Sequence, residues 1–292
     1  MRVDALEVAI VHHRTPTLLA QALQCLADVA PTTPVRVVDS AFDPSLSAQL
    51  EGVHPRLAWT PVENHSYAAA VNAAARLATR PLLLQMNADV TLGRSTLPAL
   101  AAAFEDPRVA AAGPLVRTPQ GRLQDHGVPY RWHQARLRWP PRTGTRPASV
   151  DAPWLSGCAQ VLRLDALRAI GGFDARLRFY NEDLEWCLRA RRLGWRCRLV
   201  DVEAVHVGAA SSAGRLSFAL EGLRGGYAVT RRHGPAWLRP LHRWGLVLGA
   251  EAMAWRSRDA EQRRAWRALA RRAADDGLAR PLFGSRLDEP LC

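Results

Sequence analysis

The segment Leu164–Ser212 reads LDALRAIGGFDARLRFYNEDLEWCLRARRLGWRCRLVDVEAVHVGAASS, and it carries the most information on the fold. A Gly-Gly-Phe-Asp turn precedes an acidic pair, Glu182 and Asp183, which opens an Arg-rich amphipathic stretch. A short apolar run then ends at His206. This order predicts a carboxylate at a helix start and an imidazole at a strand end. Both groups can face one cleft, an arrangement suited to deprotonating a hydroxyl beside a metal-bound diphosphate.

The first half of the chain alternates short apolar runs with helical patterns. Strands are expected at Leu6–Val11, Pro34–Asp39, Leu57–Thr60, Pro81–Met86 and Val109–Val116. Helices are expected at Thr17–Val29, Tyr67–Ala78 and Ser95–Phe104. This alternation predicts an α/β fold with a doubly wound, mostly parallel sheet. Such sheets bind ligands beyond the carboxyl ends of their strands, where Asp39 and Asp89 fall.

Two later regions depart from this pattern. Arg117–Trp154 is rich in Arg, Pro, Gly, Trp and His, and it predicts a long loop or short hairpins over the cleft. Beyond residue 213 the patterns are helical, at Arg215–Arg232, Leu246–Trp255 and Ala260–Ala274, before a tail from Pro281 to Cys292. We therefore expect a catalytic domain over residues 1–212 and a C-terminal helical region over residues 213–292.

The composition is that of a folded protein with a strong positive charge. The 292 residues are 48% hydrophobic and 23% charged, ordinary values for a globular chain. The net charge is +12, and every basic residue except histidine is Arg because the chain has no Lys. An Arg-only, Ala-rich composition is typical of a GC-rich genome. The positive field would still attract phosphate-bearing substrates and an anionic membrane face.

The cysteines and the apolar runs exclude several other classes. The five Cys residues show no C-x-x-C spacing, which argues against a zinc site or a disulfide framework. The apolar stretch near the N-terminus is too short for a signal peptide and predicts a first strand. No uninterrupted apolar run is long enough to span a bilayer.

The segment Val62–Val90 contains two further motifs, in VENHSYAAAVNAAARLATRPLLLQMNADV. Together with the strand-ending Asp39 and the segment quoted first, they resemble family 2 inverting glycosyltransferases of the GT-A fold. The family pattern E-N-x-G-F-x-x-A-x-N is matched at Glu63, Asn64, Tyr67, Ala70 and Asn72. Asn87-Ala88-Asp89 is an N-x-D version of the family's metal motif. The resemblance covers most of residues 6–212 and is strongest to rhamnosyl- and galactofuranosyl-type bacterial members.

The resemblance implies a role for each matched residue. A GT-A enzyme has a Rossmann-like nucleotide-binding half and an acceptor half. Asp183 would be the general base, with Glu182 beside it orienting the acceptor or the base. Asp89 and His206 would hold a divalent cation, Mg²⁺ or Mn²⁺. The nucleotide contacts would come from His12, Asp39, Asn64, Asn72 and Asn87, and the acceptor contacts from Trp154 and Gly157.

Each of these residues also has an ordinary structural explanation. Asn-Ala-Asp is a common strand-to-helix turn, and acids are favoured in the first turn of any helix. Glu185 and Arg189 are spaced as a surface ion pair. His206 can be a satisfied strand-end histidine, His12 and its neighbour can lie in a solvated loop, and Trp154 can fill the core. Asp183 and Glu182 both stay open as the base.

The sequence therefore predicts transfer of a sugar, with inversion, from a UDP-, dTDP- or GDP-linked donor to a saccharide or lipid-linked acceptor. The setting would be bacterial cell-surface polysaccharide synthesis, in the cytoplasm or at the inner face of the plasma membrane. The Trp- and Leu-rich stretch after residue 236 either contacts that membrane peripherally or packs on the catalytic domain.

Two other classes of function remain as alternatives. The segment Ser40–Pro44 replaces the family's Asn-x-Ser-x-Asp-Gly, which favours an inactive nucleotide-sugar-binding protein of the same fold. An Arg-rich nucleic-acid binder is the third class, but no helix-turn-helix, RNA-binding or zinc motif supports it, so no nucleic-acid partner is expected.

Overall fold

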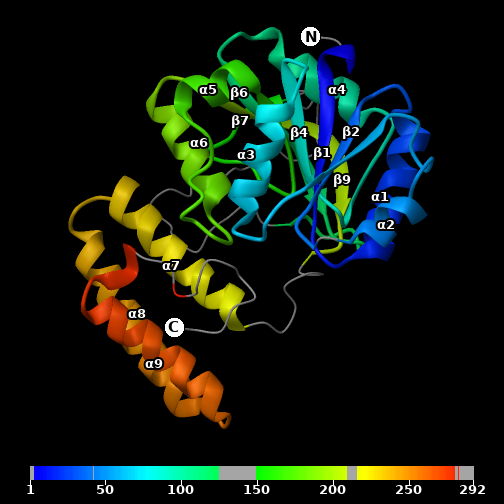
Figure 1. Cartoon of the computed structure of the whole chain (residues 1–292). Coiled ribbons are helices and arrows are strands. Elements are labelled where there is room, and N and C mark those ends of the chain that lie inside the picture. Colours follow the sequence, from blue (N-terminus) through cyan, green and yellow to red (C-terminus); the bar gives the residue numbers. More distant parts are fainter. Residues whose placement is uncertain (1–2, 42, 125–148, 209–215, 280–281, 283–292) are drawn as a thin grey trace.

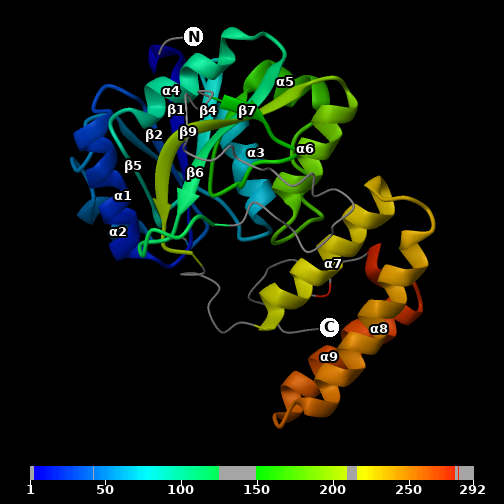
Figure 2. The same ribbon diagram turned by 180° about the vertical axis from the view of Figure 1, so that it is seen from behind.

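The computed structural model describes residues 3–41, 43–124, 149–208, 216–279 and 282 (Figure 1). Most of the predicted loop region Arg117–Trp154 and the predicted tail after Leu282 lie outside these residues. The described residues form a layered sheet domain and a group of C-terminal helices (Figures 1 and 2).

One half of the sheet is parallel. It consists of β3 (Leu57–Pro61), β2 (Val35–Asp39), β1 (Leu6–His12) and β4 (Leu82–Asn87), in that spatial order. β-Branched and leucine side chains dominate these strands because both faces of the sheet are covered. The register places His12 beside Asp39 and Val11 beside Asn87. The carboxyl ends of β1, β2 and β4 therefore meet at one edge.

The other half of the sheet is mixed. β8 (Ala159–Arg163) runs antiparallel between β4 and β6 (Val109–Arg117), and β9 (Arg196–His206) pairs in parallel with β6. β5 (Val90–Leu92) and β7 (Ser149–Asp151) each pair antiparallel with β9. The mostly parallel α/β sheet is confirmed. The sequence did not predict β5 or β7, because three-residue strands carry too little pattern.

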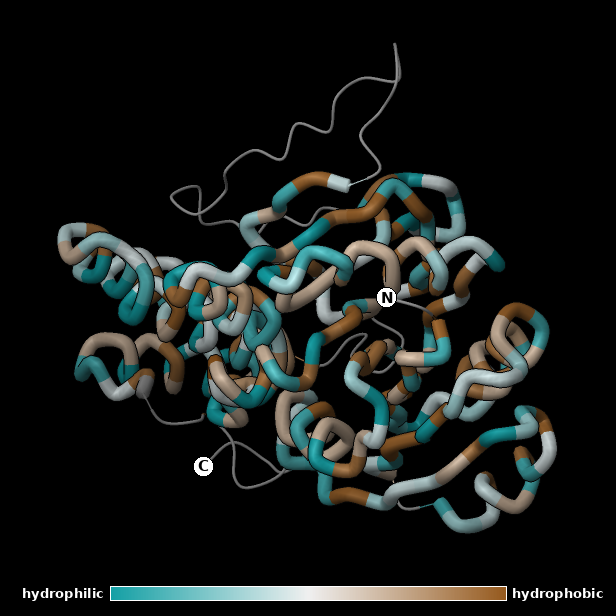
Figure 3. Tube along the Cα trace, turned by 90° about the horizontal axis from the view of Figure 1, so that it is seen from above, coloured by the Kyte–Doolittle hydropathy of each residue, from teal (hydrophilic) through white to brown (hydrophobic). Residues whose placement is uncertain are grey.

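Helices cover both faces of the sheet. One face packs against α1 (Pro16–Val29), α2 (Pro44–Gln49) and α4 (Thr96–Ala102), and the other against α3 (Tyr67–Leu77), α5 (Leu164–Ile170) and α6 (Glu182–Arg192). Val8 and Ile10 point to the first layer and Ala9 to the second, as the two-residue period of a strand requires. In Figure 3 the trace inside the sheet domain contains hydrophobic stretches, whereas hydrophobic and hydrophilic residues alternate along the helical coils. Single 3-10 turns lie at Val3–Ala5, Ala103–Glu105 and Gly277–Ala279.

The C-terminal helices are α7 (Leu216–His233), α8 (Leu238–Arg256) and α9 (Ala260–Ala274). α8 begins earlier than predicted, because Pro240 falls in its first turn, where no intrahelical N–H bond is lost. α8 and α9 lie side by side and extend away from the sheet domain (Figures 1 and 2). Of the helices that the structure describes, none is long and apolar enough to cross a membrane.

α7 joins the two parts of the molecule. Val229 packs into the core beside α6, whereas Leu220 and Tyr227 pack into a smaller core with α8 and α9. The predicted domain boundary after residue 212 falls within residues 209–215, outside the described residues.

Candidate active site

The first turn of α6 is fixed against the loop that precedes β8. The Gly157 N–H donates to Asp183 Oδ2 (2.7 Å), and the Leu184 N–H donates to Oδ1 (2.7 Å). A Cβ on residue 157 would lie 3.2 Å from the Asp183 Cβ, so glycine permits this approach. On its other side, the Gly157 carbonyl accepts a hydrogen bond from the Tyr67 hydroxyl (2.9 Å). The sequence predicted Gly157 as an acceptor contact, and in the structure its N–H binds Asp183.

The two adjacent carboxyl groups differ in their surroundings. Burial raises the pKa of Glu182 to about 8, with a further contribution from the charge of Asp183, and Glu182 Oε2 is buried without a hydrogen-bond partner. Burial also raises the pKa of Asp183, but the N–H groups of Gly157 and Leu184 oppose that change. A proton held by the pair is therefore better placed on Glu182. This leaves Asp183 as the proton acceptor and favours it over Glu182 as a base.

A second polar group lies where β4 and β9 end. His206 Nε2 is 3.2 Å from Asp89 Oδ1 and 3.3 Å from Asn87 Nδ2. His206 Nδ1 lies 2.8 Å from Gln124 Oε1, and Gln124 Nε2 donates to the His206 carbonyl (3.1 Å). The Gly208 N–H donates to the other oxygen of Asp89 (3.0 Å). Gln124 thus holds the proton on Nδ1 and leaves Nε2 directed at Asp89.

These residues fit a divalent cation that is completed by a substrate. Neighbouring ligand atoms of a six-coordinate Mg²⁺ lie about 3 Å apart, close to the 3.2 Å between Asp89 Oδ1 and His206 Nε2. Burial lowers the pKa of His206, but its hydrogen bonds to Asp89 and Cys158 outweigh burial and raise it to about 10. A proton on Nε2 therefore occupies the position that a cation would take. Within the described ranges, no three His, Cys, Asp or Glu side chains cluster as a complete site.

Two consecutive residues connect the acidic pair with the Asp89–His206 group. Gly157 donates to Asp183, and the carbonyl of Cys158 accepts from the N–H of Asn87 (2.9 Å). The two groups that the sequence placed on separate elements are thus held on either side of a single dipeptide.

His12 and Asp39 form a buried pair at the ends of β1 and β2. His12 Nδ1 lies 3.0 Å from Asp39 Oδ1, and Thr15 N–H donates to Nε2 (3.1 Å). Burial would raise the pKa of Asp39, but hydrogen bonds from His12, Ala41 and Asp43 lower it. The solvated-loop interpretation of His12 is therefore wrong. His12 Nδ1 helps to hold Asp39 ionised at the strand edge, while Nε2 is occupied by the Thr15 N–H.

Three other predicted contacts have mainly structural surroundings. Asn72 forms two hydrogen bonds with the backbone of Phe173, at 2.8 and 2.9 Å, so its amide anchors the Gly-Gly-Phe-Asp turn and is not free for a nucleotide. Trp154 is buried in the core beside α6, which corrects its assignment as an acceptor contact in favour of the core interpretation. Asn64 is buried between β3 and α3.

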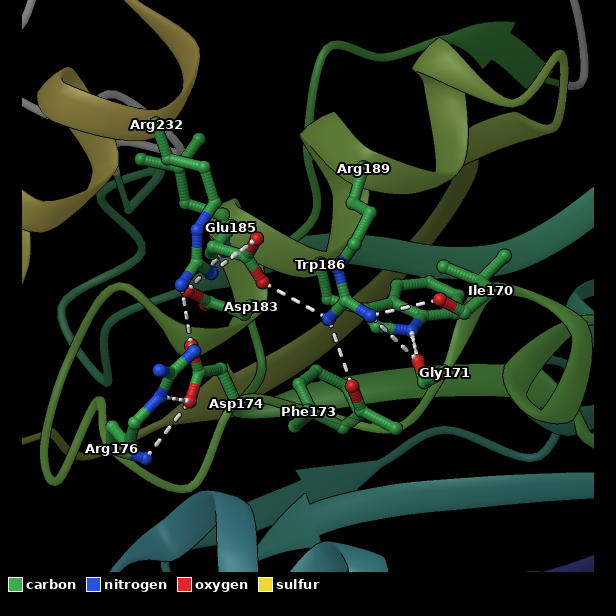
Figure 4. A network of polar contacts seen from close by, with 12 residues as sticks. Ile170, Gly171, Phe173, Asp174, Arg176, Asp183, Glu185, Trp186, Arg189 and Arg232 are labelled. Carbon is green, nitrogen blue, oxygen red and sulfur yellow. Dashed lines mark hydrogen bonds and ion pairs between the residues drawn. The ribbon is translucent and has the colours of Figure 1, made fainter.

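Glu185 and Arg189 form the predicted ion pair, which is drawn in Figure 4. The prediction that this pair lies at the surface is wrong, because Glu185 is only 1% exposed. Its carboxylate binds Arg189 (3.0 Å) within α6, and Arg232 (2.8 Å) and His233 (3.1 Å) of α7. Burial raises the pKa of Glu185, but the effect of these three partners is larger than that of burial, and the pKa is lowered to about 2. Arg232 also binds Asp174 of the Gly-Gly-Phe-Asp turn (2.8 Å). The network ties α7 to the turn and helix that carry the acidic pair.

α7 also packs tightly on the residues before Glu182. Tyr180 and Asn181 both have left-handed backbones, with φ of 66° and 70°. Asn181 Nδ2 donates to the Gly222 carbonyl of α7 (2.9 Å). A Cβ at Gly225 would lie 3.1 Å from Asn181 Nδ2. Two consecutive strained residues are thus fixed against a helix that lies far along the chain.

Sequence reasoning missed several residues of this region. Gln124 lies in a stretch without period, and no sequence signal marks it. Arg232 ends the predicted helix Arg215–Arg232 and His233 follows it, and no sequence signal linked either residue to the site. Tyr67 was found as a motif match, but its hydrogen bond to Gly157 could not be predicted from the sequence.

Comparisons with known proteins relate the chain to a family and to a curated relative. The family model described as "Glycosyl transferase family group 2" matches residues 82–273. An N-acetylglucosaminyl-diphospho-decaprenol L-rhamnosyltransferase of Mycobacterium tuberculosis is 31% identical over 182 residues, which cover 55% of this chain and 58% of the relative. The chain thus matches a little over half the length of that curated relative.

Solved structures show the same fold at low sequence identity. GalNAc-T7 with UDP, GalNAc and Mn²⁺ superposes with a TM-score of 0.60 at 15% identity, covering 77% of this chain and 47% of that chain. The mannosyltransferase PcManGT from Pyrobaculum calidifontis, in complex with GDP-Man and Mn²⁺, gives a TM-score of 0.59 at 19% identity, covering 96% and 86%. These likenesses show the GT-A fold.

Proposed function

Because the chain belongs to glycosyl transferase family group 2, we propose that it moves a sugar from a nucleotide-diphosphate donor to an acceptor hydroxyl with inversion. The observation that carries the proposal is the Gly157–Cys158 dipeptide. It binds Asp183 through one residue and the end of β4 through the next. A proton acceptor and a candidate diphosphate site are thereby held in a fixed relationship.

The reaction follows from the roles of these groups. Asp183 accepts the proton of the acceptor hydroxyl, whose oxygen forms a bond to the anomeric carbon of the donor. The bond from that carbon to the diphosphate oxygen breaks, and the nucleoside diphosphate leaves with the electron pair. Asp89 and His206 would hold a divalent cation that neutralises charge on the leaving group. Glu182, kept neutral by burial, can donate a hydrogen bond to the acceptor or to Asp183.

The donor would lie over the parallel half of the sheet. Asp39, held ionised by His12, is placed to accept hydrogen bonds from a ribose or base at the carboxyl edge of β2. Asn87 and Asn64 would add neutral contacts. The donor class is a UDP-, dTDP- or GDP-linked sugar, and UDP and GDP-Man in the neighbouring structures support that class.

The acceptor proposed is a saccharide, carried on a lipid or free, in bacterial cell-surface polysaccharide synthesis. The rhamnosyltransferase relative is named for N-acetylglucosaminyl-diphospho-decaprenol and L-rhamnose, which supports a lipid-linked saccharide acceptor and a deoxyhexose donor. A lipid-linked acceptor would place the reaction at the inner face of the plasma membrane. We assign the chemistry to residues 1–212 and a supporting role to the helices of residues 213–292.

A screen of nucleotide sugars tests the proposal. The melting temperature of the full chain is measured with each donor, in Mn²⁺ and in EDTA. One donor is expected to raise the melting temperature with Mn²⁺ only. That donor and a polyprenyl-diphosphate saccharide should then give a product whose anomeric configuration, by NMR, is opposite to that of the donor. A product of retained configuration would refute the inverting mechanism.

A non-catalytic nucleotide-sugar-binding protein is the second candidate. Asn87 in place of the first carboxylate of the metal motif favours it, as does the altered segment Ser40–Pro44. It predicts metal-dependent donor binding with neither transfer nor slow donor hydrolysis, whereas an enzyme should show at least one of them.

A further inference from the structure

One face of α8 carries exposed apolar side chains from its first turn to its last, with Glu251 as the one acidic residue between Leu248 and Trp255. Trp237 at the start of the helix is followed at helical spacing by four more large side chains, and the five are between 49% and 86% exposed: Trp237, Leu241, Trp244, Leu248 and Trp255. Steps of four, three, four and seven residues place them on one side of a helix. At 1.5 Å per residue, this stripe is about 27 Å long. We call it the α8 stripe.

The α8 stripe lies outside the small core of the helical region. The opposite side of α8 carries Leu246, Ala250 and Ala254, which are buried, and the first two pack into the small core with α7 and α9. Next to the stripe, a Cβ at Gly245 or Gly249 would meet no atom of the described residues within 4 Å. The views in Figures 1 and 2 agree that α8 and α9 extend away from the sheet domain. This face is therefore available to another partner.

The charge of α8, α9 and the turn between them selects the partner. Residues 237–274 hold nine Arg and three acidic residues, which give this segment a clear positive charge. The Arg243 guanidinium lies over the Trp244 ring, 5.3 Å from its centroid, which brings a cation to the edge of the stripe. A second copy of this chain would bring the same positive charge to the interface. A nucleic acid would satisfy the arginines but would offer nothing apolar to two leucines.

We propose that the α8 stripe inserts into the interfacial layer of an anionic lipid bilayer, with the surrounding arginines on the lipid headgroups. An anionic bilayer supplies both negative charge and an apolar layer, and tryptophan prefers its interface. Only the biological purpose of this docking rests on the proposed function, since docking would bring the active site to a lipid-linked acceptor. The binding itself requires no donor and no turnover.

Vesicle sedimentation of the full chain tests this inference. The vesicles are phosphatidylcholine with 30% phosphatidylglycerol, or phosphatidylcholine alone. The double variant Leu241→Glu/Leu248→Glu alters only exposed positions, and its folding is checked by its melting temperature. Leu193→Glu is the matched control, because Leu193 is 59% exposed on the catalytic domain, outside the stripe. Donor-dependent melting shifts are measured on the same samples.

The wild type and Leu193→Glu should sediment with the anionic vesicles and at least tenfold less with phosphatidylcholine alone. The double variant should lose at least tenfold in partitioning and keep any donor shift. Equal sedimentation of the double variant would overturn the inference, as would equal binding to both vesicle types. So would a vesicle-independent dimer, seen by sedimentation velocity, that the double variant abolishes. Vesicle binding without any donor shift would instead count against the proposed function and leave this surface standing.

Discussion

Gly157 and Asp183 lie so close that a Cβ on residue 157 would be 3.3 Å from the Asp183 carboxylate oxygen. The 2.7 Å hydrogen bond between them joins the loop before β8 to the first turn of α6. β8 in turn pairs with β4, the strand that leads to Asp89. The position of the proposed base is therefore set by the sheet, and not only by its own helix.

Asp183→Asn should remove most transfer activity while leaving donor binding nearly unchanged. A general base contributes about 10²–10⁴-fold to the rate, and an amide cannot accept the acceptor's proton. Turnover and donor affinity are measured on the same preparation. The amide loses one of the two backbone hydrogen bonds, so the melting temperature serves as a control for folding. Near-normal turnover, combined with an inactive Glu182→Gln, would identify Glu182 as the base.

Asp89→Ala should reduce donor affinity in Mn²⁺ to the value that the wild type shows in EDTA. The carboxylate is the only anionic protein ligand in the proposed set, and Asn87→Ala should weaken binding less because an amide oxygen carries no charge. Calorimetric titration with and without metal measures both effects. A wild-type affinity that is the same in EDTA and in Mn²⁺ would contradict a role for the cation.

Gln124→Leu should weaken Mn²⁺ binding by about 10–100-fold, although Gln124 is not proposed as a ligand. Its oxygen fixes the proton on His206 Nδ1, and loss of such a partner leaves the ligand ring poorly oriented. The metal concentration for half-maximal donor binding is the measurement. Donor affinity at saturating Mn²⁺ should change little, and a large change there would point to a direct donor contact.

Glu182→Gln should flatten the pH dependence of stability. The folded state raises the pKa of Glu182 from 4.5 to about 8. The folded protein thus keeps a proton that the unfolded chain releases above about pH 4.5. For the wild type, this group lowers the free energy of unfolding as pH rises from 4.5 to 8. The variant lacks this contribution, so its melting temperature should fall less over that range. Parallel curves for the two proteins would show that Glu182 ionises normally.

Gly225→Ala should lower both stability and turnover, because the new methyl group would press on Asn181 and on the carbonyl of Tyr180, 3.2 Å away. Gly245→Ala is the matched control on α8, where the methyl group has open space. That change should raise the free energy of unfolding by up to about 1 kcal/mol, the helix-propensity difference. Thermal melts and turnover separate the two cases. Unchanged turnover in Gly225→Ala would mean that α7 does not position the acidic pair.

The local part of this fold was predictable from sequence, and the reason is periodicity. The predicted strand Leu6–Val11 and helix Ala260–Ala274 agree closely with β1 and α9, since alternation and helical spacing are properties of neighbouring residues. The start of α8 was predicted at Leu246 instead of Leu238, and the earlier start is compatible with Pro240 because the first turn of a helix tolerates proline.

The candidate site was predictable only as a set of residues. The order of motifs indicated Asp89, Asp183 and His206, but their surroundings depend on contacts between distant segments. Gln124 and His206 are 82 residues apart, and Glu185 and His233 are 48 apart. No local pattern distinguishes the buried Glu185 from a surface carboxylate.

The antiparallel insertion of β8 has a consequence for the order in which the chain can fold. One edge of β4 pairs with β1, which is made early, but the other edge waits for β8. Gln85 of β4 and its hydrogen-bonded partner Gln160 of β8 are 75 residues apart. During synthesis, the apolar strand Leu82–Asn87 therefore has an open edge until β8 has left the ribosome. Such an edge can pair with other chains. The chain is therefore exposed to aggregation during the part of translation that precedes the emergence of β8.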